Sequence, residues 1–443
     1  MARGPDLGPR VTASDRPSPP PEDRGGGPPF APPRGTQDLL PPHSERLEAL
    51  ALAAAWQARR FGFRRVETPA FEHTELFARG VGESTDIVRK EMYTFEDQGG
   101  RSLTLRPEGT APVVRAYLAN RQSLPTPFKA FYVVPMFRHE RPQAGRMRQH
   151  TQFGVEIIGT AAPLADVDVI AVGQRFLAGR GLTRFALHVN SIGDERCRPA
   201  YRELLVAFLT DHAAELCGEH RGRIPDNPLR VLDCKRPECR TATENAPRML
   251  DHLDEECRAH FDAVRSALEE EGIAHEIDHR LVRGLDYYTR TAFEFVSEVL
   301  GPTQSTLCGG GRYDGLAETL GGEPTPGVGF GLGLDRVLMA MEKEEVPLPE
   351  PEGGVFVVAM GADAQREARQ LIRGLREDGV AAEAAPEDRP LKAQLRMADR
   401  AGAAYVAIIG ERELEDGVVT MRRLSDGHQE TVKRSEVASW LSR

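Results

Sequence analysis

The sequence predicts an α+β domain built on an antiparallel sheet, interrupted by a helical insertion and followed by a smaller α/β domain. Short apolar segments typical of strands recur before and after residues 194–258, which instead contain helical segments broken by proline-rich runs. Residues 346–354, VPLPEPEGG, have the composition of a linker. After this linker, strand-like and helix-like segments alternate, as is typical of α/β domains.

The length of 443 residues suits two or three domains, each with its own core. Residues 1–33 are rich in proline, glycine and charge, so we expect a disordered tail that has too little apolar surface to order. The larger domain is then expected over residues 34–345, with the insertion at about 194–258 inside it. The α/β domain is expected over residues 355–443.

A helix and a strand are the first regular elements expected. Leu47 and Leu50 lie at near-helical spacing within Ser44–Phe61, and Ser44 is a suitable N-cap. The strand Phe63–Thr68 follows and stops at Pro69. On these residues alone, the pair indicates a helix packed on the edge of a sheet.

Two strand-like segments flank a basic turn in the middle of the larger domain. Phe131–Met136 and Gln152–Ile158 are apolar runs, so Phe137–Arg148 is expected at the mouth of a hairpin. A helix is expected over Asp166–Gly181 and a strand over Arg184–Ser191. After the insertion, further strands are expected at Ile273–Asp278, Ala292–Leu300 and Val328–Leu334.

The C-terminal domain is expected to have parallel strands with helices between them. The predicted strands are Val355–Met360, Val380–Ala384 and Tyr405–Ile409. The predicted helices are Ala364–Asp378 and Leu391–Ala401.

Composition and charge bound the class of protein. No apolar run approaches the roughly 18 residues needed to span a bilayer, and no hydrophobic segment follows the basic residues near the N-terminus, so we expect a cytoplasmic protein with no membrane partner. The net charge of −10 does not exclude a nucleic-acid partner, because phosphate affinity depends on where the cations lie. Six cysteines in a chain of this size do not resemble a secreted disulfide framework.

The basic turn carries the clearest chemical signal. Its cationic side chains are Arg138, His139, Arg141, Arg146 and Arg148. Arginine suits phosphate binding because its planar fork donates two parallel hydrogen bonds and stays charged at any working pH. On charge alone, a solvated basic hairpin is an equally good interpretation. Glu140, set among the arginines, favours a built polyanion site.

FRHERPQAGRMRQ, from Phe137, resembles motif 2 of class II aminoacyl-tRNA synthetases, in the form found in bacterial-type histidyl-tRNA synthetases. Four further segments resemble family motifs in the family's order: LRPEGT from Leu105, RGLDYYTR from Arg283, CGGGRYDGL from Cys308 and GVGFGLGLDR from Gly327. The resemblance covers the chain from about Arg34 to the C-terminus. It implies a class II synthetase-like catalytic domain, a C-terminal anticodon-binding domain, and a homodimer formed through the N-terminal helix and strand.

The resemblance also implies an activity. Histidine would attack the α-phosphorus of ATP, with Mg²⁺, to give histidyl-adenylate, which then acylates tRNA(His). Both steps build negative charge on oxygens and call for preorganised cations. Arg138 matches the family's α-phosphate ligand and Arg336 the γ-phosphate ligand, with Glu140 also at the ATP site. Arg283 matches an arginine that contacts the α-phosphate and assists adenylate formation, so Arg138 and Arg283 are the expected catalytic residues.

A histidine pocket must satisfy the ring nitrogens with buried polar groups that an apolar competitor would leave unpaired. By resemblance, Glu156 and Tyr288 read the ring, Glu108, Thr110 and Gln152 receive the α-amino group, and the others line the pocket. The expected histidine-binding residues are Glu108, Gly109, Thr110, Arg138, Gln152, Glu156, Arg283, Tyr287, Tyr288 and Tyr313. Taken without the motifs, these tyrosines and glutamates could equally be core and surface residues.

Gln143 and Arg148 match positions that the family uses near the acceptor end of tRNA. The glycines of GVGFGLG are expected to let the backbone approach ATP closely. In the C-terminal domain, arginines 366, 369, 373 and 376 recur at helical spacing, but a solvated helix face is the commoner meaning of such a run. No anticodon contact is therefore assigned to a single residue.

The insertion contains a possible zinc-ligand pattern. Cys217 and His220 form C-x2-H, and Cys234 and Cys239 form C-x4-C, which tetrahedral zinc accepts. The two pairs are separated by a proline-rich segment, and the family does not require a metal there. Unpaired thiols are the favoured interpretation, and no metal is assigned to the site.

Two other functions compete with ligase activity. The first is a regulatory paralogue resembling the non-catalytic subunit of ATP phosphoribosyltransferase, which binds histidine but charges no tRNA. Such paralogues usually lack the anticodon-binding domain and lose residues of the RGLDYYTR type, both of which are present here. The second is another class II synthetase, such as a prolyl or threonyl enzyme, for which RGLDYYT has no purpose.

Overall fold

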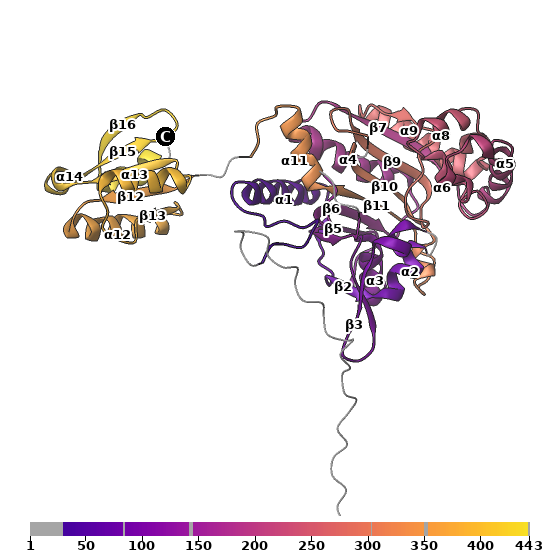
Figure 1. Ribbon diagram of the computed structural model, residues 1–443, viewed down its shortest axis with the longest axis horizontal. Helices are drawn as coiled ribbons and strands as arrows, with labels where there is room; N and C mark the ends of the chain where they lie inside the picture. Colours follow the sequence, from indigo (N-terminus) through magenta and orange to yellow (C-terminus); the bar gives the residue numbers. More distant parts are fainter. Residues whose placement is uncertain (1–29, 83–84, 141–144, 303, 350–352, 442–443) are drawn as a thin grey trace, which may run out of the picture. The chain divides into compact units, whose positions relative to one another are not determined.

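The computed structural model describes residues 30–82, 85–140, 145–302, 304–349 and 353–441. The chain forms two compact units that meet in the sequence between Val346 and Pro347, with Leu40–Leu52 grouped with the second unit. The first unit contains a large mixed sheet and the second a separate α/β sheet (Figure 1). The predicted fold class is confirmed.

An eight-stranded sheet organises the first unit, in the order β1-β5-β6-β11-β10-β9-β7-β8. In that order the strands are Arg64–Arg65, Phe128–Phe137, Gln149–Ile158, Gly327–Gly333, Thr306–Arg312, Thr289–Ser297, Phe185–Ser191 and Glu276–Ile277. Neighbours from β5 to β7 are antiparallel, as the sequence predicts, whereas β1 pairs with β5 and β8 with β7 in parallel. Apolar strands buried on both faces of the centre explain why these runs were recognisable.

The first strand is shorter than the predicted Phe63–Thr68. Only Arg64 and Arg65 pair with β5 as a ladder, and Val66 adds one N–H bond to the carbonyl of Phe131 at 2.8 Å before the chain leaves the edge. A separate three-stranded sheet, with the order β2-β4-β3, was not predicted. Its strands are Phe71–His73, Ser102–Leu105 and Tyr93–Glu96, which are short and largely exposed and so lack a clear apolar pattern.

Helices cover the sheet and begin near their predicted positions. α1 spans His43–Arg60, one residue earlier than predicted, and α4 spans Pro163–Gly179. The other helices that bear on the site are α2, Thr74–Val81, α3, Thr110–Asn120, and α11, Leu334–Lys343. Asp166 of α4 forms a fully buried ion pair with Arg312 of β10 and contacts His260 of α9, Glu255–Glu270, at 3.3 Å.

The insertion between β7 and β8 is helical, as predicted. Its helices are α5, Arg198–Asp211, α6, Gly218–Arg221, α7, Leu229–Leu232, α8, Pro237–Ala242, and α9, Glu255–Glu270. Figure 1 shows α5, α6, α8 and α9 gathered at one end of the first unit. They enclose a core of their own that includes Leu205, Val231 and Met249.

The second unit has a five-stranded sheet in the order β13-β12-β14-β15-β16. Its strands are β12, Val355–Ala359, β13, Ala382–Ala384, β14, Tyr405–Ile409, β15, Val418–Arg423, and β16, Gln429–Lys433. β12 is parallel to β13 and β14, as predicted, but β15 and β16 add an antiparallel hairpin that the sequence analysis missed. The residues of β16 are mostly exposed and polar, so this strand has little apolar pattern.

The helices of the second unit are α12, Ala362–Glu377, α13, Leu391–Arg400, α14, Glu411–Asp416, and α15, Val437–Leu441. Across both units, no helix in the described part of the chain is both long and apolar enough to cross a membrane.

Candidate active site

A cavity lies over the centre of the eight-stranded sheet, against β6, β10 and β11. Most of the predicted site residues line it: Glu108, Thr110, Arg138, Glu140, Gln152, Arg283, Tyr287, Tyr288 and Arg336. Gly109, Arg148, Glu156 and Tyr313 do not line it. Gln143 lies outside the described residues. Motifs separated by more than a hundred residues in the sequence are thus brought to one place by strand pairing.

Backbone carbonyls hold two of the cavity's arginines in place. Arg138 donates from Nε to the carbonyl of Pro107 at 2.7 Å. Arg336, at the start of α11, donates from Nε to Gly145 at 3.0 Å and from Nη1 to Thr306 at 2.8 Å. Such preorganised cations cost little reorganisation when an anion arrives.

The same cavity contains residues that were given no specific ATP or histidine role from the sequence, although Arg146 belongs to the predicted basic turn. Arg146 lies with Nε 2.7 Å from Oε2 of Glu140, and His150 of β6 also lines the cavity. Burial, together with the charges of Arg138 and Arg336, lowers the pKa of His150 to about 3. His150 is therefore a neutral imidazole at working pH. Asp335 and Leu285 also went unassigned, although each lies within a quoted motif.

Arg283 belongs to a loop without helix or strand between β8 and β9. It forms an ion pair with Glu294 of β9, and its guanidinium lies 5.7 Å from the centre of the Tyr288 ring. Burial alone would lower the pKa of Arg283, but Glu294 raises that pKa above its usual value, so the side chain stays charged. A Cβ at Gly309 of β10 would overlap the Arg283 guanidinium, so glycine there makes room for it.

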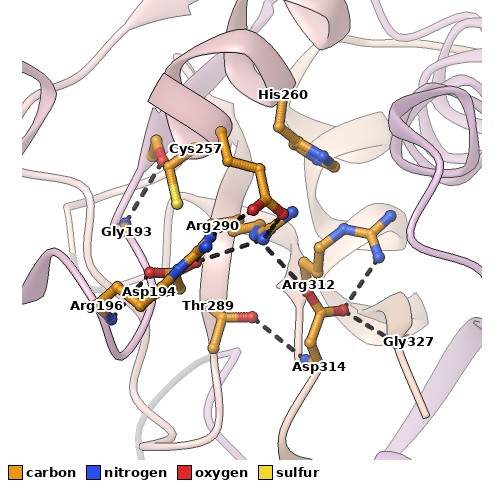
Figure 2. Close-up of polar contacts among 12 residues, drawn as sticks. Gly193, Asp194, Arg196, Cys257, His260, Thr289, Arg290, Arg312, Asp314 and Gly327 are labelled. Carbon is orange, nitrogen blue, oxygen red and sulfur yellow. Dashed lines mark hydrogen bonds and ion pairs between the residues drawn. The ribbon is translucent and has the colours of Figure 1, made fainter. Parts of the chain in front are cut away.

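The end of this loop is fixed to the insertion. Arg198 of α5 donates to the carbonyls of Ile192 and Tyr288, the first at 2.8 Å. Arg290 has a φ of 48° and donates to Glu256 at 2.6 Å. Figure 2 shows Arg290 and Arg196 converging on Asp194, with Arg312 and Asp314 beside them. A charged network therefore connects the end of the loop that carries Arg283 to the insertion and to β10.

Glu108 caps a helix beside the cavity. Its oxygens accept the N–H groups of Thr110 at 2.7 Å and Ala111 at 3.0 Å, at the start of α3. Burial raises its pKa, while those two hydrogen bonds oppose the rise. Gly109 immediately precedes α3, and a Cβ there would overlap the ring of Tyr132. Gly109 therefore makes room for a neighbouring side chain in this structure.

Glu156 lies behind the cavity wall with no exposed surface. Its carboxylate accepts hydrogen bonds from Tyr313 at 2.5 Å, Thr110 at 2.8 Å and Tyr132 at 3.3 Å. Burial raises the pKa of Glu156 to about 8, although the bonds from Tyr313 and Thr110 act to lower it. Tyr132, which no motif pointed to, also accepts from Nε2 of Gln152 at 3.2 Å. Glu108, Thr110 and Gln152 form the polar floor of the cavity. Glu156 and Tyr132 connect Thr110 and Gln152 behind this floor.

The glycines of β11 make room for this network, and Gly331 and Gly333 also line the cavity; their expected close approach to ATP stays a prediction. A Cβ at Gly327 would overlap Tyr313, and one at Gly329 would overlap the Glu156 carboxylate. A Cβ at Gly331 would lie 2.7 Å from Nε2 of Gln152. Because β6 and β11 are paired, glycine on one strand leaves space for polar side chains on the other.

The side chain of Arg148 makes hydrogen bonds to the protein backbone. It donates from Nε to the carbonyl of Glu140 at 3.2 Å and from Nη1 to that of Arg34 at 3.1 Å. Its backbone also pairs with Arg138 and Gly35. These bonds hold the base of the β5–β6 hairpin, and the tRNA contact of Arg148 stays a prediction.

Comparison with known proteins agrees with these motifs. A family model described as "Histidyl-tRNA synthetase" matches residues 35–337, and one described as "Anticodon binding domain" matches residues 354–443. A "Histidine--tRNA ligase" of Anoxybacillus flavithermus is 48% identical over 91% of this chain and 96% of its own length. The structure of apo histidyl-tRNA synthetase from S. aureus has a TM-score of 0.76 and 37% identity, covering 94% of this chain and 100% of that one.

A Bacillus halodurans structure described as an ATP phosphoribosyltransferase regulatory subunit/histidyl-tRNA synthetase has a TM-score of 0.61 and covers 84% of this chain and 97% of its own. At 24% identity, this is a likeness of fold alone.

Proposed function

The chain belongs to the histidyl-tRNA synthetase family, and we propose that the arginines of its central cavity form histidyl-adenylate from histidine and ATP. It is a histidine–tRNA ligase, with ATP as substrate. The regulatory paralogue is less well supported, since a relative 48% identical over most of the chain is a ligase and an anticodon-binding domain is present.

One observation carries the residue assignments: four arginines meet in the cavity that also holds the polar floor. They are Arg138, Arg146, Arg283 and Arg336. In the first step, a histidine carboxylate oxygen bonds to the α-phosphorus of ATP and the bond to the bridging oxygen breaks, which releases pyrophosphate. Negative charge grows on the α-phosphate and the leaving group, and fixed cations stabilise it. Typically, one such donor contributes about 10²- to 10³-fold in rate.

We assign Arg138 and Arg283 to the α-phosphate and Arg336 to the γ-phosphate. The backbone bond of Arg138 uses its Nε, and Nη1 lies 4.0 Å from Oε1 of Glu140, so the Nη groups can fork onto phosphate oxygens once Nη1 leaves this long ion pair. The two carbonyl bonds of Arg336 are made by Nε and Nη1, so neither of them uses Nη2. Neutral His150 beside them can donate to a phosphate without adding a further charge.

Mg²⁺ would accompany ATP in this proposal. Glu140 and Asp335 are carboxylates that line the cavity beside these arginines, and Mg²⁺ prefers oxygen ligands. Asp335 is oriented by the N–H of Thr151, which lies 2.9 Å from Oδ2. These residues fit a cation held mainly by ATP phosphates, whose charge it would neutralise. Removal of Mg²⁺ by EDTA should abolish adenylate formation, and added Mg²⁺ should restore it.

Histidine would lie on the polar floor. Glu108, Thr110 and Gln152 offer oxygens to its α-amino group, while Tyr288 and Glu156 are placed to satisfy the ring. Tyr287 closes the side of the pocket, and Tyr313 packs behind it at 5.8 Å between ring centres. Glu156 does not line the cavity, so its contact with the ring requires a shift of Thr110, which lines the cavity and donates to Glu156 at 2.8 Å. An apolar amino acid would leave this buried network unpaired.

The cavity volume of 170 Å³ is below the roughly 300 Å³ at which small-molecule pockets begin. We therefore expect the site to widen when histidine and ATP bind together. The loop Leu281–Tyr288, which has no regular secondary structure, is the segment best suited to move.

The second unit would bind the anticodon of tRNA(His). It contains a concave site of 570 Å³ lined by Arg369, Arg373 and Arg376 of α12 and by Glu377 and Glu387, and the excess of arginine supports contact with a phosphate backbone. We further propose a cytoplasmic homodimer. Exposed Leu52 and Trp56 on α1 support it, at 65% and 57% of their full exposure, since apolar side chains of this size favour burial at an interface.

Amino-acid-dependent pyrophosphate exchange tests the proposal. Exchange should occur with histidine and with no other standard amino acid, and tRNA(His) should then become charged. Histidine binding without exchange would instead identify a regulatory paralogue. Exchange driven by proline or threonine would identify a different synthetase.

A further inference from the structure

The insertion gathers four metal-ligating side chains outside the active site. Cys217, His220, Cys234 and Cys239 place three sulfurs and one imidazole nitrogen within 4.8 Å of one another. The three cysteines are nearly fully buried, at 5%, 7% and 0% exposure for Cys217, Cys234 and Cys239. Free thiols were the favoured interpretation of the sequence because a proline-rich segment separates the two pairs. The fold of that segment brings the two pairs together.

The spacing suits tetrahedral zinc. With Zn–S bonds of about 2.3 Å, sulfurs around one ion lie about 3.8 Å apart, within the span observed. The sulfur of Cys217 is 3.0 Å from Nδ1 of His220. The N–H of Cys217 also points to the sulfur of Cys239 at 3.2 Å, a contact that stabilises a metal-bound thiolate. Thiols buried only as small apolar groups have no reason to converge with an imidazole on one point.

The helices around this cluster are too short to be stable on their own. α6 and α7 have four residues each and α8 has six, whereas isolated helices below about 12 residues are marginal in water. The ligands lie just before α6, within it, just after α7 and within α8. A single ion would therefore join all three helices.

We propose that Cys217, His220, Cys234 and Cys239 bind one Zn²⁺ as a structural site. Four protein ligands leave no open position, so the ion has no catalytic role. The assignment does not depend on the proposed function.

A second cluster in the insertion does not suit a metal. Asp194, Cys197, Asp254 and Cys257 are also close together. However, Arg196 and Arg290 lie 3.1 and 3.4 Å from Oδ2 of Asp194, so cationic side chains already neutralise it (Figure 2). Asp254 is likewise engaged as the N-cap of α9.

The zinc-bound segment would brace the catalytic loop. Between the ligand pairs, Arg230 of α7 donates to the carbonyl of Gly284 at 3.2 Å, and Asn227 donates to Asp286 at 3.3 Å. Both acceptors belong to the loop that carries Arg283. Loss of the ion should therefore loosen this loop as well as the helices.

Metal content tests the site directly. The full chain, purified without metal-affinity chromatography, should contain one zinc ion per chain, as measured by inductively coupled plasma mass spectrometry. Co²⁺ in its place should give the intense visible bands of tetrahedral thiolate coordination. Cys234→Ser should lose the metal, whereas His220→Cys, which supplies four thiolates, should keep it. Cys197→Ser, the matched control from the second cluster, should also keep it.

Hydrogen exchange of the wild-type chain gives a second readout if Cys234→Ser does not fold. Chelation should speed amide exchange in residues 217–240 and in the loop 281–288, with the second unit as internal reference. A wild-type chain without zinc that takes up none when supplied would overturn the proposal. Zinc loss in Cys197→Ser alone, or unchanged exchange in residues 217–240 after chelation, would also overturn it.

Discussion

Glu156→Gln tests how the pocket recognises the histidine ring. Glu156 is fully buried, accepts three hydrogen bonds and has a pKa raised to about 8 by burial. Below that pKa the carboxyl is mainly protonated, so at pH 7 about one tenth of free enzyme carries the carboxylate that we expect to accept the ring N–H. Affinity for histidine should rise as pH rises through 8.

The magnitude follows from this population. A hydrogen bond to a charged group contributes roughly 1.5 to 3 kcal/mol, so at pH 9 the glutamine variant should have a KM for histidine about 10- to 150-fold above wild type. At pH 7 that ratio should be about tenfold smaller, because only the competent fraction of the wild type binds. The KM for ATP should stay nearly unchanged in both proteins.

Pyrophosphate exchange at several pH values supplies the measurement. The glutamine variant serves as the matched control, since titration of the histidine amino group or of other residues affects both proteins and cancels in the ratio. A ratio independent of pH would show that Glu156 acts in another form. Equal increases of KM for both substrates would mean that Glu156 supports the fold of the site and refute the ring contact.

Three further predictions concern other parts of the chain. Arg336→Ala should raise the KM for ATP about 10- to 100-fold and leave the KM for histidine nearly unchanged, and equal effects would remove Arg336 from the phosphate site. Deletion of Val355–Arg443 should spare exchange but lower kcat/KM for tRNA by about 10²-fold or more; undiminished charging would refute the anticodon assignment. Asp166→Asn should lower the free energy of unfolding by about 1.5 to 3 kcal/mol in urea, because buried Arg312 loses one charged partner and keeps Asp314 at 3.1 Å; a loss below about 0.5 kcal/mol would contradict this.

Much of the fold could be predicted because its strands are continuous apolar runs. β14 matches the predicted Tyr405–Ile409, and β5 and β6 extend the predicted strands at both ends of the basic turn. β16 was missed because four of its five residues are exposed and only Val432 is buried. A strand at a sheet edge needs only backbone pairing, which leaves little trace in composition.

The site was predictable where a motif carries its own chemistry, as Arg138 and Arg336 do. Roles that depend on packing between strands were not accessible. Whether Gly329 faces ATP or a carboxylate depends on its partner across the ladder, which sequence order does not reveal. The burial that raises the pKa of Glu156, and the convergence of three cysteines on His220, depend in the same way on distant segments.

Histidine-dependent pyrophosphate exchange by Arg283→Ala tests most directly the claim that fixed arginines drive adenylate formation. Removal of this buried, charged side chain should slow exchange by about 10²- to 10³-fold; because it also breaks the ion pair with Glu294, exchange is compared at a temperature at which circular dichroism shows the variant to be folded. Arg280→Ala is the matched control, since Arg280 lies three residues earlier between β8 and β9 and does not line the cavity. It should exchange at the wild-type rate. Near-wild-type exchange by Arg283→Ala would contradict the account.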